Sequence, residues 1–162
     1  MTRSPYYDES HEAFRATVRR FVDKEIAPFV DEWDEAGGFP RELYKKAADV
    51  GILGLGYPEE FGGSPCDQFH RIVLSQELAR AASGGVAASL MSHTIGSPPI
   101  LAVGPAAMKQ RVLPQVLAGE KVSALAITEP SGGSDVAQLK TTAKRVGDHY
   151  VVNGSKMFIT SG

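Results

Sequence analysis

The sequence lacks the features that define several classes of protein. Its one cysteine, Cys66, excludes an internal disulfide, and because no cysteine or histidine cluster stands out, we expect no metal site. The 17 basic and 19 acidic residues leave a formal charge of −2 without a basic patch, so we expect no nucleic-acid partner. No Gly-x-Gly-x-x-Gly motif joins a strand to a helix, so a Rossmann dinucleotide site is not supported.

We expect neither a targeting segment at the N-terminus nor an uninterrupted apolar span. Residues 1–6 contain no apolar core of a secretory signal, and Asp8, Glu9 and Glu12 are unlike an acid-poor transit peptide. Residues 81–108 contain no Asp, Glu, Lys or Arg, but glycines and prolines break this stretch repeatedly. We therefore expect buried helices in a cytoplasmic protein that has no membrane partner.

Apolar residues at three- and four-residue steps predict helices through most of the chain. They recur over residues 14–33, which predicts one long amphipathic helix, bent near Pro28 and ended by the glycines that follow residue 36. A second helix is expected over residues 41–50, and a third begins after Asp67, a good N-cap residue.

The periodicity changes close to Glu120. A last helix is expected from Pro105, and the apolar pattern beyond Glu120 alternates as it does in strands. Helices followed by strands are typical of an α+β protein with segregated layers. We therefore expect a helical domain over residues 1–121 and the start of a β-domain over residues 122–162.

A glycine-rich motif opens the second part. Residues 124–128 predict a strand, and the sequence that follows, Glu-Pro-Ser-Gly-Gly-Ser-Asp over residues 129–135, predicts a tight loop. Backbone N–H groups around glycines form a concave nest for anions, and Ser131 and Ser134 add hydroxyl donors. A hairpin turn without a ligand accounts for the same residues.

A second motif follows a predicted hairpin. Gly147 and Asp148 lie between two strand patterns, residues 141–146 and 149–152, and Asn153-Gly154 precedes a strand that ends with residues 157–160, Met-Phe-Ile-Thr. Three strands are therefore expected after the glycine-rich loop.

The two motifs, in this order and at this spacing, resemble the acyl-CoA dehydrogenase family, flavoenzymes that desaturate acyl-CoA thioesters. Residues 51–55, 58–63 and 113–120 also look like the N-terminal domain of that family, so the resemblance covers nearly the whole chain. It implies a helical domain, then an antiparallel β-domain, then a C-terminal helical bundle that residues 1–162 do not reach.

The resemblance implies FAD as the cofactor. The Thr160 hydroxyl would bond near flavin N5, and Phe158 would pack against the ring, where the family more often has tryptophan. An ordinary core aromatic explains Phe158 equally well. The cofactor-binding residues implied in this way are Leu125, Ile127, Thr128, Gly133, Ser134, Phe158, Ile159 and Thr160.

The resemblance also implies an acyl-CoA substrate. Ser134 would meet its CoA part, and Leu90 and His93 would line the acyl pocket, although a lone histidine on an apolar helix is commonly a core residue. The family's catalytic base is a glutamate of the C-terminal domain, so we expect no catalytic residue in this chain and no activity from it alone. Glu129 is expected to shape its turn or to pair with a neighbouring N–H group.

Three functions remain open from the sequence. The first is an acyl-CoA dehydrogenase that passes electrons to an electron-transfer flavoprotein or a similar acceptor and forms a homo-oligomer, usually a tetramer in the family. The second is an acyl-CoA oxidase or a flavin monooxygenase on the same scaffold. The third is a non-catalytic helical interaction module.

Overall fold

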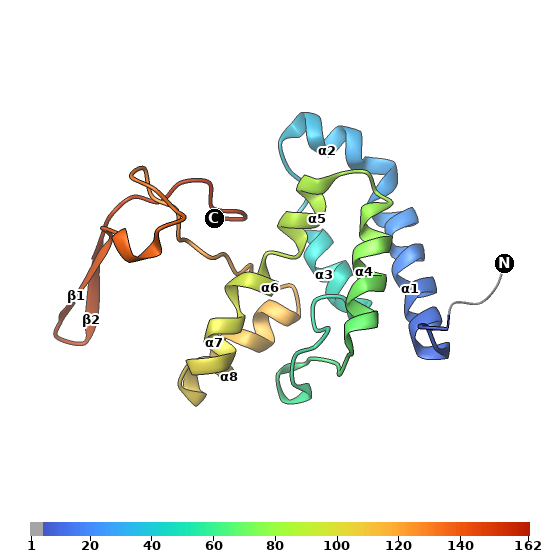
Figure 1. The fold of residues 1–162 in the computed structure, drawn as a ribbon, viewed down its shortest axis with the longest axis horizontal. Coiled ribbons are helices and arrows are strands. Elements are labelled where there is room, and N and C mark those ends of the chain that lie inside the picture. Colours follow the sequence, from blue (N-terminus) through green and yellow to red (C-terminus); the bar gives the residue numbers. More distant parts are fainter. Residues whose placement is uncertain (1–4) are drawn as a thin grey trace.

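The computed structural model describes residues 5–162, so the first four residues, which were examined for a targeting signal, lie outside the described part. A helical part is followed by an irregular segment that contains one hairpin (Figure 1). The helices are α1 (Glu9–Glu25), α2 (Val30–Ala36), α3 (Glu42–Asp49), α4 (Gln68–Ala79), α5 (Gly84–Leu90), α6 (His93–Gly96), α7 (Pro98–Val103) and α8 (Ala106–Leu117). This arrangement confirms the predicted fold class, a helical domain followed by the beginning of an antiparallel β-domain.

The long helix predicted near the N-terminus is interrupted as well as bent. A short 3-10 helix, Ala27–Phe29, separates α1 from α2, because Pro28 has no N–H group to continue the α-helical ladder. Gly37 ends α2 in the left-handed conformation at φ 75°, as predicted. Asp67 caps α4 as expected, since its carboxylate accepts the backbone N–H of His70 at 3.0 Å.

The helices enclose a main apolar core and a smaller cluster around Leu113 and Leu117 of α8. Helix α1 contributes Val18 and Val22, α4 contributes Leu74, and α5 contributes Leu90. One buried charge also joins α1 to α4: the Glu77 side chain is 2% exposed and accepts two hydrogen bonds of 2.9 Å from the guanidinium of Arg19. Arg15 and Arg80 lie beside the same carboxylate, at 3.2 and 3.3 Å. These charge-assisted contacts connect α1 to α4 through one buried carboxylate.

No single helix within residues 5–162 has the length and hydropathy of a membrane span. The adjoining segments Gly84–Leu90 and His93–Val103 meet those criteria only together, and they are bent by 43°.

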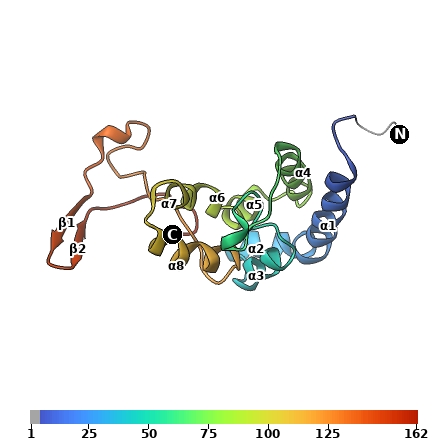
Figure 2. The same ribbon diagram turned by 90° about the horizontal axis from the view of Figure 1, so that it is seen from below.

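The segment after α8 carries the predicted hairpin. Strand β1 (Thr142–Val146) pairs with β2 (His149–Asn153) in antiparallel register, and Val146 lies opposite His149 across the turn. The hairpin projects away from the helices, whereas the C-terminal residues return to them (Figures 1 and 2). The predicted pairing of residues 141–146 with residues 149–152 is therefore confirmed.

Two predicted strands are wrong. Residues 124–128 and 157–160 are extended or bent but form no ladder, and a single backbone bond joins them, from the Met157 N–H to the Thr128 carbonyl at 2.9 Å. The conformation of Phe158, with φ at +56°, also departs from that of a strand. An alternating apolar pattern alone therefore does not form a strand, because a strand needs a neighbouring strand that continues the hydrogen-bonded ladder.

Gly119 marks the point at which the chain leaves the helical part. Its φ is +72°, and a Cβ atom there would lie 2.5 Å from the Tyr44 carbonyl oxygen of α3. Gly119→Ala should therefore lower the free energy of unfolding by about 1–3 kcal/mol through strain and overpacking. Denaturant unfolding measures this effect, with Gly38→Ala as the matched control, since a Cβ at Gly38 meets nothing within 4 Å. Equal losses in the two variants would contradict the close packing at Gly119.

Candidate functional site

The structure brings the two sequence motifs together although 27 to 29 residues separate the groups in contact. The Lys156 ammonium donates to the Ile127 carbonyl at 2.9 Å and to a Glu129 carboxylate oxygen at 3.0 Å. The next residue, Met157, donates its N–H to the Thr128 carbonyl. The end of the second motif is thus held beside the start of the first.

Glu129 is the centre of this junction. Its side chain is 4% exposed, and its two carboxylate oxygens accept the backbone N–H groups of Lys140 at 2.7 Å and Thr141 at 2.9 Å. The adjacent Thr141 side chain, these two N–H groups and the Lys156 ammonium lower the pKa of Glu129 to about 2. Such a carboxylate is a poor proton acceptor, and the structure confirms the other interpretation of Glu129, pairing with backbone N–H groups, here those of Lys140 and Thr141.

The glycine-rich loop is a tight turn that retains free donors. The backbone groups of Glu129 and Gly132 bond to each other in both directions, at 2.9 and 3.0 Å. The N–H groups of Ser131, Gly133 and Ser134 make no hydrogen bond within residues 5–162. Gly133 packs so closely on Thr128 that an added Cβ would lie 2.9 Å from the Thr128 hydroxyl oxygen. The hairpin-turn and anion-nest interpretations are therefore compatible in one loop.

An apolar surface lies on the same two segments. Leu125 and Met157 are 37% and 39% exposed, and Phe158 is 87% exposed. A positive φ is rare for a bulky aromatic residue, and such strained conformations concentrate at functional sites. Ile127 and Ile159 are half-buried, whereas Thr160 is exposed. Of the predicted cofactor-binding residues, Ile127, Thr128 and Gly133 therefore lie at the junction, beside the segment that continues into Phe158.

The predicted acyl-pocket residues lie elsewhere, within the helical core. Leu90 is fully buried, and His93 is 4% exposed. The backbone carbonyl of His93 accepts the hydroxyl of Tyr57 at 3.0 Å, and burial lowers the pKa of the His93 imidazole, which favours its neutral form. Neither residue touches the loop that contains Ser134, so a substrate contact for Leu90 and His93 stays a prediction.

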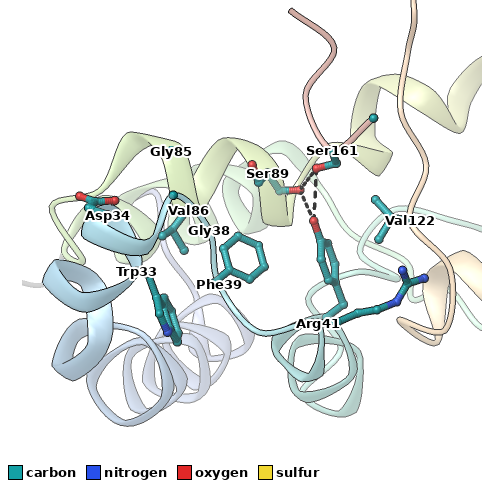
Figure 3. A pocket seen from close by; sticks show the side chains of 13 residues that line it. Trp33, Asp34, Gly38, Phe39, Arg41, Gly85, Val86, Ser89, Val122 and Ser161 are labelled. Atoms are coloured by element: carbon teal, nitrogen blue, oxygen red, sulfur yellow. Dashed lines mark hydrogen bonds between the residues drawn. The ribbon is translucent and has the colours of Figure 1, made fainter.

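A pocket of about 580 Å³ lies where the second motif returns to the helices (Figure 3). The Tyr44 hydroxyl and the Ser161 hydroxyl both reach the Ser89 carbonyl, at 3.0 and 3.3 Å, and they lie 3.3 Å from each other. The rings of Trp33 and Phe39 line the same pocket. These contacts hold the residue after Thr160 against α3 and α5.

Sequence reasoning missed Lys156, Tyr44 and Ser161 as positioning residues. Lys156 stands inside the second motif, so its place there was an available signal. The contacts of Tyr44 with Ser161 span 117 residues of sequence, and no local pattern encodes them.

Two family models match the sequence. Residues 8–120 match the N-terminal domain of acyl-CoA dehydrogenases, and residues 124–162 match the middle domain. A 3-(aryl)acrylate reductase of Clostridium sporogenes is 38% identical over 156 residues, which cover 96% of this chain and 41% of the relative. The mitochondrial long-chain specific acyl-CoA dehydrogenase of Rattus norvegicus is also 38% identical over 156 residues, 96% of this chain and 36% of the relative.

Solved structures give the same result. A protein described as an acyl-CoA dehydrogenase from Mycobacterium smegmatis has a TM-score of 0.92 at 48% identity, over 98% of this chain and 42% of that one. An acyl-CoA dehydrogenase of Bacillus anthracis, solved in complex with FAD, has a TM-score of 0.83 at 34% identity. The match covers 97% of this chain and 28% of that one. The chain therefore spans less than half the length of the proteins it matches. Since the two models together cover nearly all of its residues, the chain belongs to the acyl-CoA dehydrogenase family.

Proposed function

We propose that this chain supplies the FAD-binding segments of an enzyme that desaturates an acyl-CoA thioester between its α and β carbons. The observation that carries the proposal is the junction of the two motifs, in which Lys156 bonds to Ile127 and Glu129. This junction gathers free N–H donors, hydroxyls and an exposed aromatic ring in one place. Membership of the acyl-CoA dehydrogenase family supports the same activity.

The residues present fit FAD in two respects. The free N–H groups of Ser131, Gly133 and Ser134 suit its phosphates, because an anion needs several donors in a concave loop. The exposed side chains of Leu125 and Phe158 suit a planar ring system. When bound, FAD supplies the acceptor for the hydride that leaves the β carbon.

The residues of this chain would bind and orient rather than transfer the proton. The Thr160 hydroxyl is proposed to donate a hydrogen bond at the flavin N5 position, and Ser134 to meet the pyrophosphate or the CoA phosphates. The α-proton would go to a glutamate of a C-terminal domain, because the Glu129 carboxylate already accepts hydrogen bonds from Lys140, Thr141 and Lys156. Leu90 and His93 remain our candidates for the acyl pocket.

We also propose an electron acceptor, an oligomeric state and a location for the enzyme. We expect an electron-transfer flavoprotein or a similar electron acceptor, a homo-oligomer formed by the full-length protein, and a cytoplasmic location. The 38% identity to the aryl acrylate reductase of Clostridium sporogenes favours a second candidate, the reverse reaction, in which a hydride adds to a conjugated double bond. An oxidase or monooxygenase remains the alternative on the same scaffold.

Cofactor content and direction are tested on purified protein that also contains the C-terminal domain, because the base that takes the α-proton is expected there. We expect one FAD per chain after release by heat and chromatography. Anaerobic mixing with acyl-CoA should then bleach the flavin, whereas mixing the reduced protein with an aryl acrylate should leave it reduced. Reoxidation by the aryl acrylate would favour the reductase, and rapid reoxidation by air would favour the oxidase. A protein with no affinity for FAD would contradict the proposal.

Ser134 gives a test of the loop. Ser134→Ala removes one hydroxyl donor, so affinity for FAD or for acyl-CoA should fall by about 1.5–3 kcal/mol, the usual contribution of a hydrogen bond to a charged group. Calorimetric titration with each ligand measures this loss. Ser75→Ala is the control, because Ser75 is an exposed serine on α4. Unchanged affinity for both ligands would leave the loop with the role of a turn alone.

A further inference from the structure

The N-terminal ends of α1 and α4 bring the His11 side chain against those of Asp67 and His70, which lie far from His11 in the sequence. His11 lies in the first turn of α1, Asp67 caps α4, and His70 lies in the first turn of α4. One nitrogen of each histidine and one carboxylate oxygen of Asp67 lie within 4.8 Å of one another. His11 and Asp67 are 56 positions apart, so no local sequence pattern predicts this cluster.

The spacing of the ligand atoms is close to that of a zinc site. The His11 Nε2 atom lies 3.0 Å from both Asp67 carboxylate oxygens, and the His70 Nδ1 atom lies 2.9 Å from one of them. Bonds of about 2.0–2.2 Å around tetrahedral zinc place neighbouring ligand atoms roughly 3.3 Å apart. Small side-chain rotations would therefore admit the ion between the three groups.

The outer contacts of both rings also suit a metal. The Nδ1 atom of His11 lies 2.8 Å from the Asp8 carboxylate, which is the arrangement that orients metal-binding histidines. The Nε2 atom of His70 lies 3.5 Å from the Ser10 hydroxyl. With metal bound, each ring would carry its proton on this outer nitrogen, and the present bond from the Asp8 N–H to His11 Nδ1 would give way to a bond that His11 donates to the Asp8 carboxylate.

The three candidate ligands differ in solvent exposure, with one side chain buried and two within reach of solvent. The His11 side chain is 5% exposed and held by the helix pair, whereas those of His70 and Asp67 are 18% and 53% exposed. A rigid inner ligand with two reachable outer ligands leaves a route for the ion and positions for water.

We propose that His11, Asp67 and His70 form a binding site for a divalent transition-metal ion, of which zinc is the best match. Two imidazoles and one carboxylate favour zinc, cobalt or nickel over magnesium and calcium, which prefer oxygen ligands. The ion would link the first turn of α1 to the first turn of α4. Since it binds the folded chain, it would raise the stability of the helical part, by a free energy that grows with the logarithm of the zinc concentration divided by the dissociation constant. The site lies apart from the two motifs and does not depend on the proposed function.

The test uses the purified protein after removal of metals with a chelator. Calorimetric titration with zinc should show one ion per chain, and cobalt should give the visible absorption of a low-coordinate site. His70→Gln keeps a polar helix-forming side chain but loses the metal ligand, and Asp67→Asn keeps an oxygen that can cap α4. Each variant should bind zinc at least tenfold more weakly, as expected for the loss of one of three ligands, and should lose the zinc-dependent rise in melting temperature.

His149→Ala is the matched control, because His149 also lies beside a carboxylate, that of Asp148 at 3.1 Å, but on the exposed hairpin. This variant should bind zinc as the parent protein does. The proposal is overturned if the parent protein binds no zinc, if both cluster variants bind it unchanged, or if His149→Ala abolishes binding. Circular dichroism before each titration establishes that the variants are folded.

Discussion

Glu129→Ala is expected to abolish tight binding of FAD while the helical part stays folded. The substitution removes the acceptor of the Lys140 and Thr141 N–H groups and the partner of the Lys156 ammonium in one step. Without that junction, the second motif loses its fixed position beside the first. The ratio of FAD to protein after gel filtration measures the effect, and circular dichroism reports on the helices.

The pH dependence of this junction follows from the same contacts. They lower the pKa of Glu129 from 4.5 to about 2, so its carboxylate stabilises the folded state fully above about pH 4.5, and this stabilisation disappears as the pH falls toward 2. FAD retention should accordingly be insensitive to Glu129 titration near neutral pH.

Glu60→Ala, at an exposed carboxylate, is the control for Glu129→Ala and should retain FAD. Equal retention by the Glu129 and Glu60 variants would disprove the role of the junction.

Thr160→Val should slow flavin reduction by roughly 10- to 100-fold, the effect of losing one hydrogen bond worth about 1.5–3 kcal/mol to a charge that develops in the reaction. Valine keeps the β-branched shape of threonine, so the backbone should be unaffected. Stopped-flow mixing of the FAD-bound protein with acyl-CoA measures the rate.

A second threonine provides the control for this experiment. Thr142 begins β1 and is exposed, so Thr142→Val makes the same chemical change away from the second motif. Its reduction rate should equal that of the parent protein. If Thr160→Val also retains the parental rate, with FAD bound and the fold intact, Thr160 has no part in the site.

Features with a local cause could be predicted from the sequence. Pro28 lacks a donor, Gly37 accepts a left-handed conformation, and the Asp67 side chain reaches the next turn, so the helix ends near these residues follow from their chemistry. The hairpin at Gly147 belongs to the same class, since its turn sequence sets the register.

Features with a distant cause could not be predicted. The apolar residues 124–128 and 157–160 have the pattern of strands, yet strand formation depends on neighbours that lie far along the chain. The contacts of Lys156 with Ile127 and Glu129 likewise depend on how the loop and hairpin return. The candidate site was therefore predictable as a set of motif residues, but its geometry was not.

We propose above all that the junction of the two motifs serves an FAD-dependent oxidation of acyl-CoA. The most direct test is anaerobic titration of the FAD-bound protein, in a form that includes the C-terminal domain, with saturated acyl-CoA thioesters of increasing chain length, with flavin absorbance and enoyl-CoA product followed together. We expect stoichiometric bleaching of the flavin and formation of one α,β-unsaturated thioester per FAD with at least one chain length. Bound FAD that no acyl-CoA reduces at any chain length would contradict it.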